Sequence, residues 1–147
     1  HITRPHVAYF GQKDYQQWLI LSVMVKQENR PVKVARAPIV REANGLARSS
    51  RNERLTPEDR QRATALYRNL QWAAEQIKLN TLTPEEATTE AVRRIKAEEP
   101  SVEVEYIEAA DAATLRPVKN RANTSALVLC GAVIIGGVRL IDNVVIV

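Results

Sequence analysis

The stretch PHVAYFGQKDYQQ, residues 5–17, decides the fold of the first part of the chain. Its opening residues, Pro5 to Phe10, form a short apolar run that Gly11 closes, a pattern typical of a buried parallel strand ending in a turn. From Lys13 to about Asn29 the apolar side chains recur every three to four residues, which predicts a helix.

A second strand is expected directly after this helix. Asn29-Arg30-Pro31 stops the helix, because proline disfavours helical backbone in the residue before it. Val32, Val34 and Ala37 then indicate an extended segment. A strand, a helix and a strand of this length make a βαβ unit, and ligands favour the loops at the carboxyl ends of its strands. One such unit cannot bury both faces of its strands, so this piece needs more sheet than the chain supplies.

The following part of the chain predicts two helices. After a loop that ends near Leu55, Thr56-Pro57 and Thr83-Pro84 each place a capping threonine before a proline at the first helical position. Apolar side chains at helical spacing carry the first helix to about residue 78 and the second through Ile95.

The last third of the chain predicts an antiparallel sheet. Val102 to Tyr106 alternates as a half-buried strand should, and Leu127–Ile135 and Val138–Val147 are longer apolar runs. Gly136-Gly137 between these runs is a two-residue hairpin signal. We therefore expect the chain to be α/β, with the strand-helix-strand piece followed by a small α+β domain of two helices on an antiparallel sheet.

Composition excludes several classes of protein. A net charge of +4 on 147 residues is too small an excess to indicate a nucleic-acid partner. The single cysteine, Cys130, lies in an apolar run and is expected in the core; it cannot form an intrachain disulfide, so a reducing compartment such as the cytoplasm is expected. One cysteine and two histidines cannot build a Cys/His zinc site, and we assign no metal ligand. The longest apolar stretch, Ala126 to Val138, has 13 residues, fewer than the roughly 20 of a bilayer span, so no membrane association is expected.

The turn after the first strand is one candidate anion site. Gly11 would allow close backbone approach, Lys13 supplies a positive charge, and the amides of the first helical turn favour an anion. No phosphate-loop pattern of the Walker or dinucleotide type is present. Exposed first-turn residues beside an ordinary turn glycine therefore remain the alternative interpretation.

The stretch IVREANGLARSSRN, residues 39–52, is the second candidate. It lies in a basic segment, since residues 26–54 hold eight Lys or Arg and three acids. Serine hydroxyls and arginine guanidinium groups on a loop that contains glycine offer several donors to a polyphosphate. A solvated basic loop is the alternative. Composition and spacing thus indicate two candidate anion-binding loops, and no particular reaction.

Taken together, the two stretches resemble the pantothenate synthetase (pantoate–β-alanine ligase) family. The matching motifs are YFGQKDYQQ at 9–17, VRE at 40–42, GLA at 45–47, SSRN at 49–52 and RLIDN at 139–143. Their order and spacing match the family from about Ile2 to the end of the chain. The resemblance implies that residues 1–42 are the C-terminal βαβ part of a Rossmann-like nucleotidyl-transferase domain. Residues 43–147 would be the small domain that carries the phosphate-side loop.

The resemblance also implies a reaction and a site. In this family ATP and pantoate, with Mg²⁺, give pantoyl adenylate and pyrophosphate, and the amine of β-alanine then displaces AMP. The implied catalytic residues are Lys13, Ser49, Ser50 and Arg51. Gln17 would bind pantoate, and Val40 would meet the adenine through its backbone. The implied ATP-binding residues are Gly11, Gln12, Lys13, Asp14, Val40, Arg48, Ser49, Ser50 and Arg51.

Two departures from the family pattern are visible. Arg48 stands where the family usually has Met or Leu, and its guanidinium would either strengthen phosphate binding or crowd the adenine. The amino-terminal half of the family, with its His-x-Gly-His-type motif and its homodimer contact, is absent from these 147 residues. We therefore expect a C-terminal piece of such a ligase that is inactive alone. The rivals are a non-catalytic nucleotide-binding module and, less favoured, a basic nucleic-acid binder using residues 26–54.

Overall fold

The computed structural model describes residues 3–120 and 126–147. Contacts divide the chain into two compact units, His1–Val40 and Arg41–Val147. The assignment of residues 1–42 and 43–147 to two domains of a larger enzyme stays a prediction.

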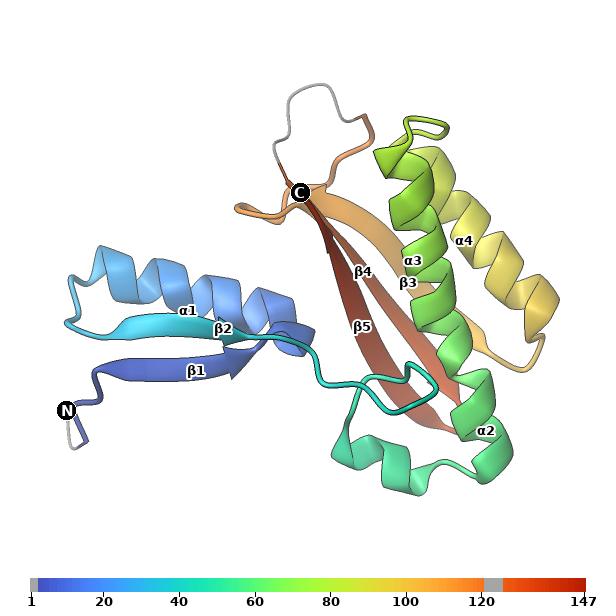
Figure 1. Cartoon of the computed structure of the whole chain (residues 1–147), viewed down its shortest axis with the longest axis horizontal. Coiled ribbons are helices and arrows are strands. Elements are labelled where there is room, and N and C mark those ends of the chain that lie inside the picture. The colour runs from blue at the N-terminus through green and yellow to red at the C-terminus, as the bar shows by residue number, and fades with distance from the viewer. Residues whose placement is uncertain (1–2, 121–125) are drawn as a thin grey trace. The chain divides into compact units, whose positions relative to one another are not determined.

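The first unit is a parallel βαβ motif. Strand β1 (Val7–Gly11) leads through a 3₁₀ turn, η1 (Gln12–Asp14), into helix α1 (Tyr15–Gln27). Strand β2 (Lys33–Ala37) returns parallel to β1, and α1 lies alongside the two strands (Figure 1). The predicted strand-helix-strand order is confirmed. The helix is shorter than predicted because the 3₁₀ turn occupies its expected start and Asn29, with a φ of 49°, adopts left-handed backbone beyond its end.

The first unit buries little of its apolar surface. Among residues 3–40, Tyr15 is the only side chain that is fully buried. Its ring packs edge-on against Trp18, with 5.3 Å between ring centroids, and the Arg36 guanidinium lies 4.9 Å from the centroid of Trp18. Ile20 of α1 stays 56% exposed. This exposure agrees with the expectation that a single βαβ unit cannot cover both faces of its strands.

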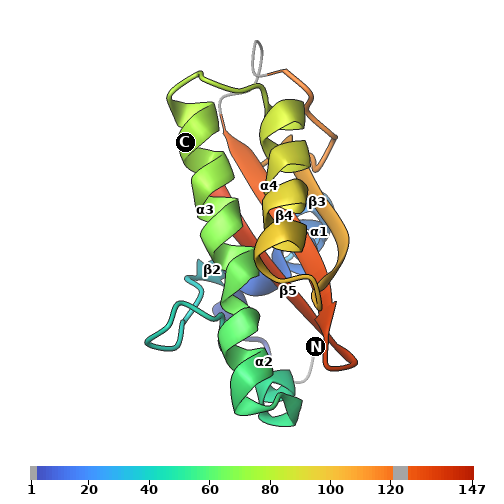
Figure 2. The same cartoon turned by 90° about the vertical axis from the view of Figure 1, so that its right-hand side faces the viewer.

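The second unit is a layer of helices on an antiparallel sheet. Its strands β3 (Glu103–Asp111), β4 (Leu127–Ile135) and β5 (Val138–Ile146) pair in the order β3-β4-β5. Helices α3 (Thr64–Lys78) and α4 (Pro84–Glu98) lie side by side over one face of this sheet (Figure 2). The predicted α/β class and antiparallel sheet are confirmed. The hairpin at Gly136-Gly137 is confirmed as well, with φ angles of 54° and 71°.

The two helix starts are confirmed at their capping threonines. The Thr56 hydroxyl accepts the backbone N–H of Asp59 before α2 (Pro57–Arg62). Thr83 begins α4 with a full capping box, in which the Glu86 carboxylate accepts the Thr83 backbone N–H at 2.8 Å. This hydrogen bond, followed by one from the Thr83 hydroxyl, lowers the pKa of Glu86.

The prediction of one unbroken helix from Thr56 to about residue 78 is wrong. The helix is interrupted at Ala63, between α2 and α3. The Thr64 hydroxyl donates to the carbonyl of Gln61 at 2.7 Å, a local bond that competes with helical backbone pairing.

The core of the second unit lies between its helices and its sheet. The largest fully buried apolar side chains are Leu70, Ile77, Ile95, Leu127, Leu129, Ile135, Ile146, Val128, Val133 and Val138. The predicted core position of Cys130 is wrong: on β4 it alternates with the core residues Leu129 and Val133, so it lies on the other face of the sheet and is only partly buried. Its partial burial still raises the pKa of the thiol to about 11. No helix in the described part of the chain is long and apolar enough to cross a bilayer.

Candidate functional site

The predicted site residues of the first unit gather where β1 turns into α1. Gly11 ends β1, Lys13 lies in the 3₁₀ turn between Gln12 and Asp14, and Gln17 follows in the first turn of α1. The backbone of Gly11 is extended, with a φ of −68°, and a Cβ added there would meet no heavy atom within 4 Å. Glycine is therefore not required by strain, and its bare backbone leaves room for a ligand to approach closely.

The predicted site residues of the second unit follow a tight turn. Arg41 and Ala47 form an antiparallel bridge, and the Glu42 N–H donates to the carbonyl of Leu46 at 2.8 Å. Gly45 closes the turn with a φ of 93°. A Cβ on Gly45 would lie 3.2 Å from Cδ1 of Tyr67, so this position needs glycine for both its backbone and its close approach.

Donor groups follow directly after this turn. Ser49 caps the 3₁₀ helix η2 (Ser50–Arg54), and its hydroxyl accepts the backbone N–H of Arg51 at 3.2 Å. The side chains of Arg48, Ser50 and Arg51 are exposed. The predicted residues 48–51 thus form one short surface loop of hydroxyl and guanidinium donors.

Asn52 fixes this loop through buried hydrogen bonds. It is 2% exposed, and its Nδ2 donates to Glu42 Oε1 at 2.8 Å and to the carbonyl of Ala47 at 3.1 Å. Nη2 of Arg60 donates to the carbonyl of Asn52 at 2.9 Å. Asn52 therefore ties the turn before the donor loop to the helix after it. Its buried Oδ1 has no hydrogen-bond partner among the described residues.

An ion pair with Asp142, near the end of the chain, stabilises the same turn. Arg41 donates to both carboxylate oxygens of Asp142, at 2.6 and 3.0 Å, and to the carbonyl of Gly45 at 3.0 Å. Its guanidinium carbon lies 3.3 Å from the ring centroid of Tyr67. Sequence reasoning quoted Arg41 and Asp142 within matching motifs but assigned neither a role, because a separation of 101 residues gives no spacing signal.

An open cavity of about 710 Å³ lies beside the donor loop. Its lining residues are Glu42, Ala43, Arg48, Ser49, Ser50, Asn52, Glu53 and Arg60. The serine hydroxyls and the Arg48 guanidinium among these residues can bind phosphate oxygens through hydrogen bonds. The carboxylates of Glu42 and Glu53 also line the cavity, and Glu42 pairs with Arg60 at 3.6 Å, so the groups that could take a phosphate are those of residues 48–50.

Val40 is the remaining predicted site residue. It is the last residue of the first unit and is 63% exposed. A contact through its backbone, as the resemblance implies, does not require its side chain to be buried.

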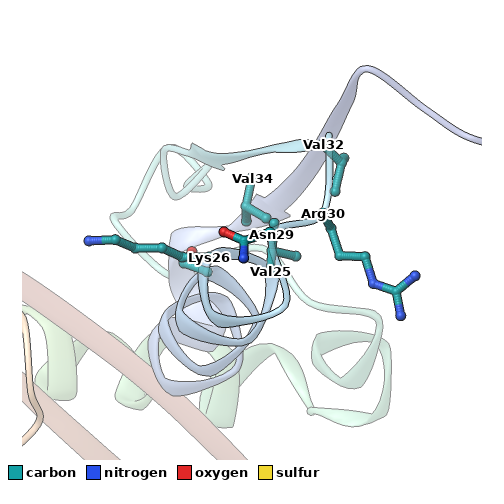
Figure 3. Close-up of a pocket in the computed structure, with 7 residues that line it drawn as sticks. Val25, Lys26, Asn29, Arg30, Val32 and Val34 are labelled. Atoms are coloured by element: carbon teal, nitrogen blue, oxygen red, sulfur yellow. The ribbon is translucent and has the colours of Figure 1, made fainter.

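The first unit holds another cavity, of about 480 Å³, that contains none of the predicted site residues. It is lined by Ser22, Val25, Lys26, Asn29, Arg30, Val32 and Val34. The side chains of Lys26 and Arg30 extend in opposite directions (Figure 3), and Arg30 pairs with Glu28 at 2.9 Å. These two cations do not converge on one ligand.

Known proteins resemble this sequence over nearly its whole length. The sequence model of the family described as Pantoate-beta-alanine ligase matches residues 1–145. A pantothenate synthetase of Moorella thermoacetica is 44% identical over 149 residues, which cover 99% of this chain and 50% of that protein. A bifunctional pantoate ligase/cytidylate kinase of Trichodesmium erythraeum is 42% identical, over 98% of this chain and 27% of its own length.

Solved structures agree with the sequence matches. Pantothenate synthetase from Thermus thermophilus superposes with a TM-score of 0.87 at 36% identity, over 97% of this chain and 50% of that structure. Pantoate-beta-alanine ligase from Francisella tularensis, complexed with beta-gamma ATP and β-alanine, gives a TM-score of 0.65 at 28% identity, over 97% of this chain and 44% of that one. The chain spans about half the length of most curated relatives it matches. Because the family model matches residues 1–145 and relatives of about 40% identity cover nearly the whole of this sequence, the chain belongs to the pantoate–β-alanine ligase family.

Proposed function

We propose that this chain takes part in the ATP-dependent ligation of pantoate and β-alanine to pantothenate. The reaction would be AMP-forming: the pantoate carboxylate attacks the α-phosphorus of ATP and releases pyrophosphate, and the β-alanine amine then displaces AMP from pantoyl adenylate. Family membership supports the overall reaction, and the Francisella relative complexed with beta-gamma ATP and β-alanine supports the substrates.

The observation that carries the proposal is the shape of the donor loop. The donors of Ser49, Ser50 and Arg51 lie on one loop. Asn52 and Arg41 stabilise the turn before it through hydrogen bonds to backbone carbonyls. Negative charge builds up on the phosphate oxygens as the adenylate forms. Donors already held in position stabilise that charge without reorganising during the reaction, which lowers the barrier.

The first unit would bind the other parts of the substrates. Lys13 would contact ATP, together with its neighbours Gly11, Gln12 and Asp14, because all lie at the carboxyl end of a parallel strand, where ligands of such folds bind. Gln17, exposed in the first turn of α1, would bind pantoate. Val40 would meet the adenine through its backbone.

Mg²⁺ would come to this site with ATP. Proteins commonly hold Mg²⁺ through substrate phosphates, water and one or two carboxylates. The described residues contain no group of three His, Cys, Asp or Glu side chains that could hold a metal ion. We propose that the metal would be held mainly by triphosphate oxygens and water.

The 147-residue chain alone would be inactive. It spans half the length of relatives such as the Moorella protein, so a complete site would need contacts from the rest of such a protein. By the same resemblance we propose that the whole enzyme is a cytoplasmic homodimer whose subunits meet outside this chain.

A ligation assay tests the proposal. The protein as expressed from its own gene should form pantothenate and AMP in equal amounts from ATP, pantoate and β-alanine, and the isolated chain should release no pyrophosphate in a single turnover. ATP binding without turnover by the gene's product would favour a non-catalytic nucleotide-binding module. Turnover by the isolated chain would contradict the proposed dependence on further contacts.

A further inference from the structure

We propose that Asp142 is a positioning residue for the donor loop: it acts through Arg41 to fix the conformation of residues 42–51 that binds the phosphates of ATP. The proposal rests on the proposed function for its ligand. It assigns a role to a side chain that lies at the opposite end of the chain from the loop it controls.

Asp142 occupies an unusual place in the sheet. Alternate residues of β5 share one face of the sheet, and Val138, Leu140 and Ile146 are buried on it. Asp142 lies at a position of the same alternation. It is therefore on the face that packs against the helices, and only 5% of it is exposed. A carboxylate at such a position costs free energy unless it is paired and hydrogen-bonded.

The carboxylate is fully engaged. Oδ2 accepts from Nη1 of Arg41 at 2.6 Å, and Oδ1 accepts both from Nη2 of Arg41 at 3.0 Å and from the backbone N–H of Asn143 at 2.8 Å. This two-point contact fixes the plane of the guanidinium as well as its position.

The orientation of Arg41 is transmitted to the loop by two further contacts. Its Nη1 donates to the carbonyl of Gly45 at 3.0 Å, and its face lies on the Tyr67 ring at 3.3 Å from the centroid. Gly45 stands at the bend of the turn, three residues before Arg48. The clamp, defined as Asp142, Arg41 and Tyr67, therefore determines where the turn that begins the donor loop can lie.

Stability alone does not explain this arrangement. Burying an ion pair usually gives no more stability than apolar side chains of similar volume would, because desolvation offsets the attraction between the charges. A buried pair that reaches across 101 residues to hold one turn is better explained by the geometry it imposes on that turn.

The test compares three variants in the protein as expressed from its own gene. Asp142→Asn keeps the shape of the side chain and removes its charge. Tyr67→Leu removes the aromatic face without leaving a buried charge unpaired, so it tests the clamp in a protein that retains the ion pair. Arg139→Gln is the matched control, because Arg139 lies on the same strand and pairs with Glu105 on the surface.

Two readouts separate positioning from general destabilisation. Asp142→Asn and Tyr67→Leu should raise the KM for ATP about 10-fold and leave the KM for β-alanine within about twofold. Hydrogen exchange should become faster at the amides of the loop, such as Glu42, Gly45 and Asn52, and stay unchanged along β4. Arg139→Gln should alter neither quantity.

Each outcome decides the proposal. An active wild-type protein whose Asp142→Asn and Tyr67→Leu variants keep both the ATP KM and the loop exchange would overturn the positioning role alone. Faster exchange along β4 with equal losses for all substrates would also overturn it, since the residues would then support the fold in general. A wild-type protein without ATP-dependent ligation would instead contradict the proposed function, whatever the variants show.

Discussion

The two units of this chain bury their apolar side chains to very different degrees. The second unit surrounds a core in which Leu70, Ile95 and Leu129 are completely buried. In the first unit Val23 and Met24 of the single helix remain 43% and 42% exposed, and Tyr9 is 74% exposed. Hydrophobic burial is the main force that stabilises a fold, so only the second unit carries the means of its own stability.

This difference also separates the two candidate loops. The donor loop at Ser49–Arg51 rests on Asn52 and on the Arg41–Asp142 pair, all within the self-supporting unit. The turn at Gly11–Gln17 belongs to the unit that lacks a core of its own. We therefore expect the phosphate-side loop to keep its shape in the isolated chain more firmly than the strand-to-helix turn does.

The largest expected effect is on independent folding. A protein of residues 41–147 should unfold in one cooperative thermal transition, whereas a peptide of residues 1–40 should show none, because it cannot bury enough apolar surface to offset its conformational entropy. Circular dichroism during heating measures both. A cooperative transition in the short peptide would break the comparison.

The next largest effect is expected when a buried side chain is shortened, which should destabilise the second unit more than the first. Leu70→Ala in the 147-residue chain should lower the free energy of unfolding by about 3 kcal/mol, because it opens a cavity among fully buried side chains. Val23→Ala, on the exposed side of α1, should change it by no more than about 0.5 kcal/mol. Urea denaturation compares the two, and equal losses would mean that the first unit is as well packed as the second.

Alanine substitutions at two glycines compare the stability of the two candidate loops. Gly45→Ala should cost about 1–2 kcal/mol, since alanine disfavours the left-handed backbone and its Cβ would press on Tyr67. Gly11→Ala should be nearly neutral for stability, because its backbone is extended and its surroundings are open. Similar unfolding midpoints for both variants would show that the turn at Gly45 is not held as described.

The smallest expected effects concern the start of α4. Thr83→Ala should cost about 1 kcal/mol by removing the helix cap. Because hydrogen bonds from Thr83 lower the pKa of Glu86 in the folded protein, the ionised carboxylate contributes stability above the pKa of the unfolded chain, about 4.3. That contribution is lost as the pH falls through the lower folded pKa.

Glu86→Gln measures this contribution. The difference in unfolding free energy between the wild type and this variant should be largest near neutral pH and should shrink in acid. A difference that grows as the pH falls would contradict the capping box.

Local signals predicted most of the fold. The threonine-proline caps and the Gly136-Gly137 hairpin are read correctly because each depends on a few neighbouring residues. The break at Ala63 was missed because no glycine or proline marks it, and the bond from the Thr64 hydroxyl leaves no pattern in the sequence. The strand expected at Val102–Tyr106 extends through Asp111, since its later residues gain their partners from β4.

The candidate site was predictable only in part. The resemblance supplied the donor residues Arg48 to Arg51, which lie on one loop. The residues that hold this loop could not be identified, because Asn52 reaches back to Glu42 and Arg41 reaches across the chain to Asp142. Such pairs depend on how the chain folds back on itself, and spacing does not reveal them.

The most direct test of the central claim is the KM for ATP of the whole protein with Arg51→Ala, compared with Arg54→Ala. Both arginines are exposed on the same 3₁₀ helix, but only Arg51 belongs to the predicted phosphate-binding loop. The account predicts that Arg51→Ala raises the KM for ATP about 10-fold, or lowers kcat with it, and that Arg54→Ala changes neither by more than about twofold. Equal effects of the two substitutions, or none from Arg51→Ala, would contradict the assignment of this loop to the phosphates of ATP.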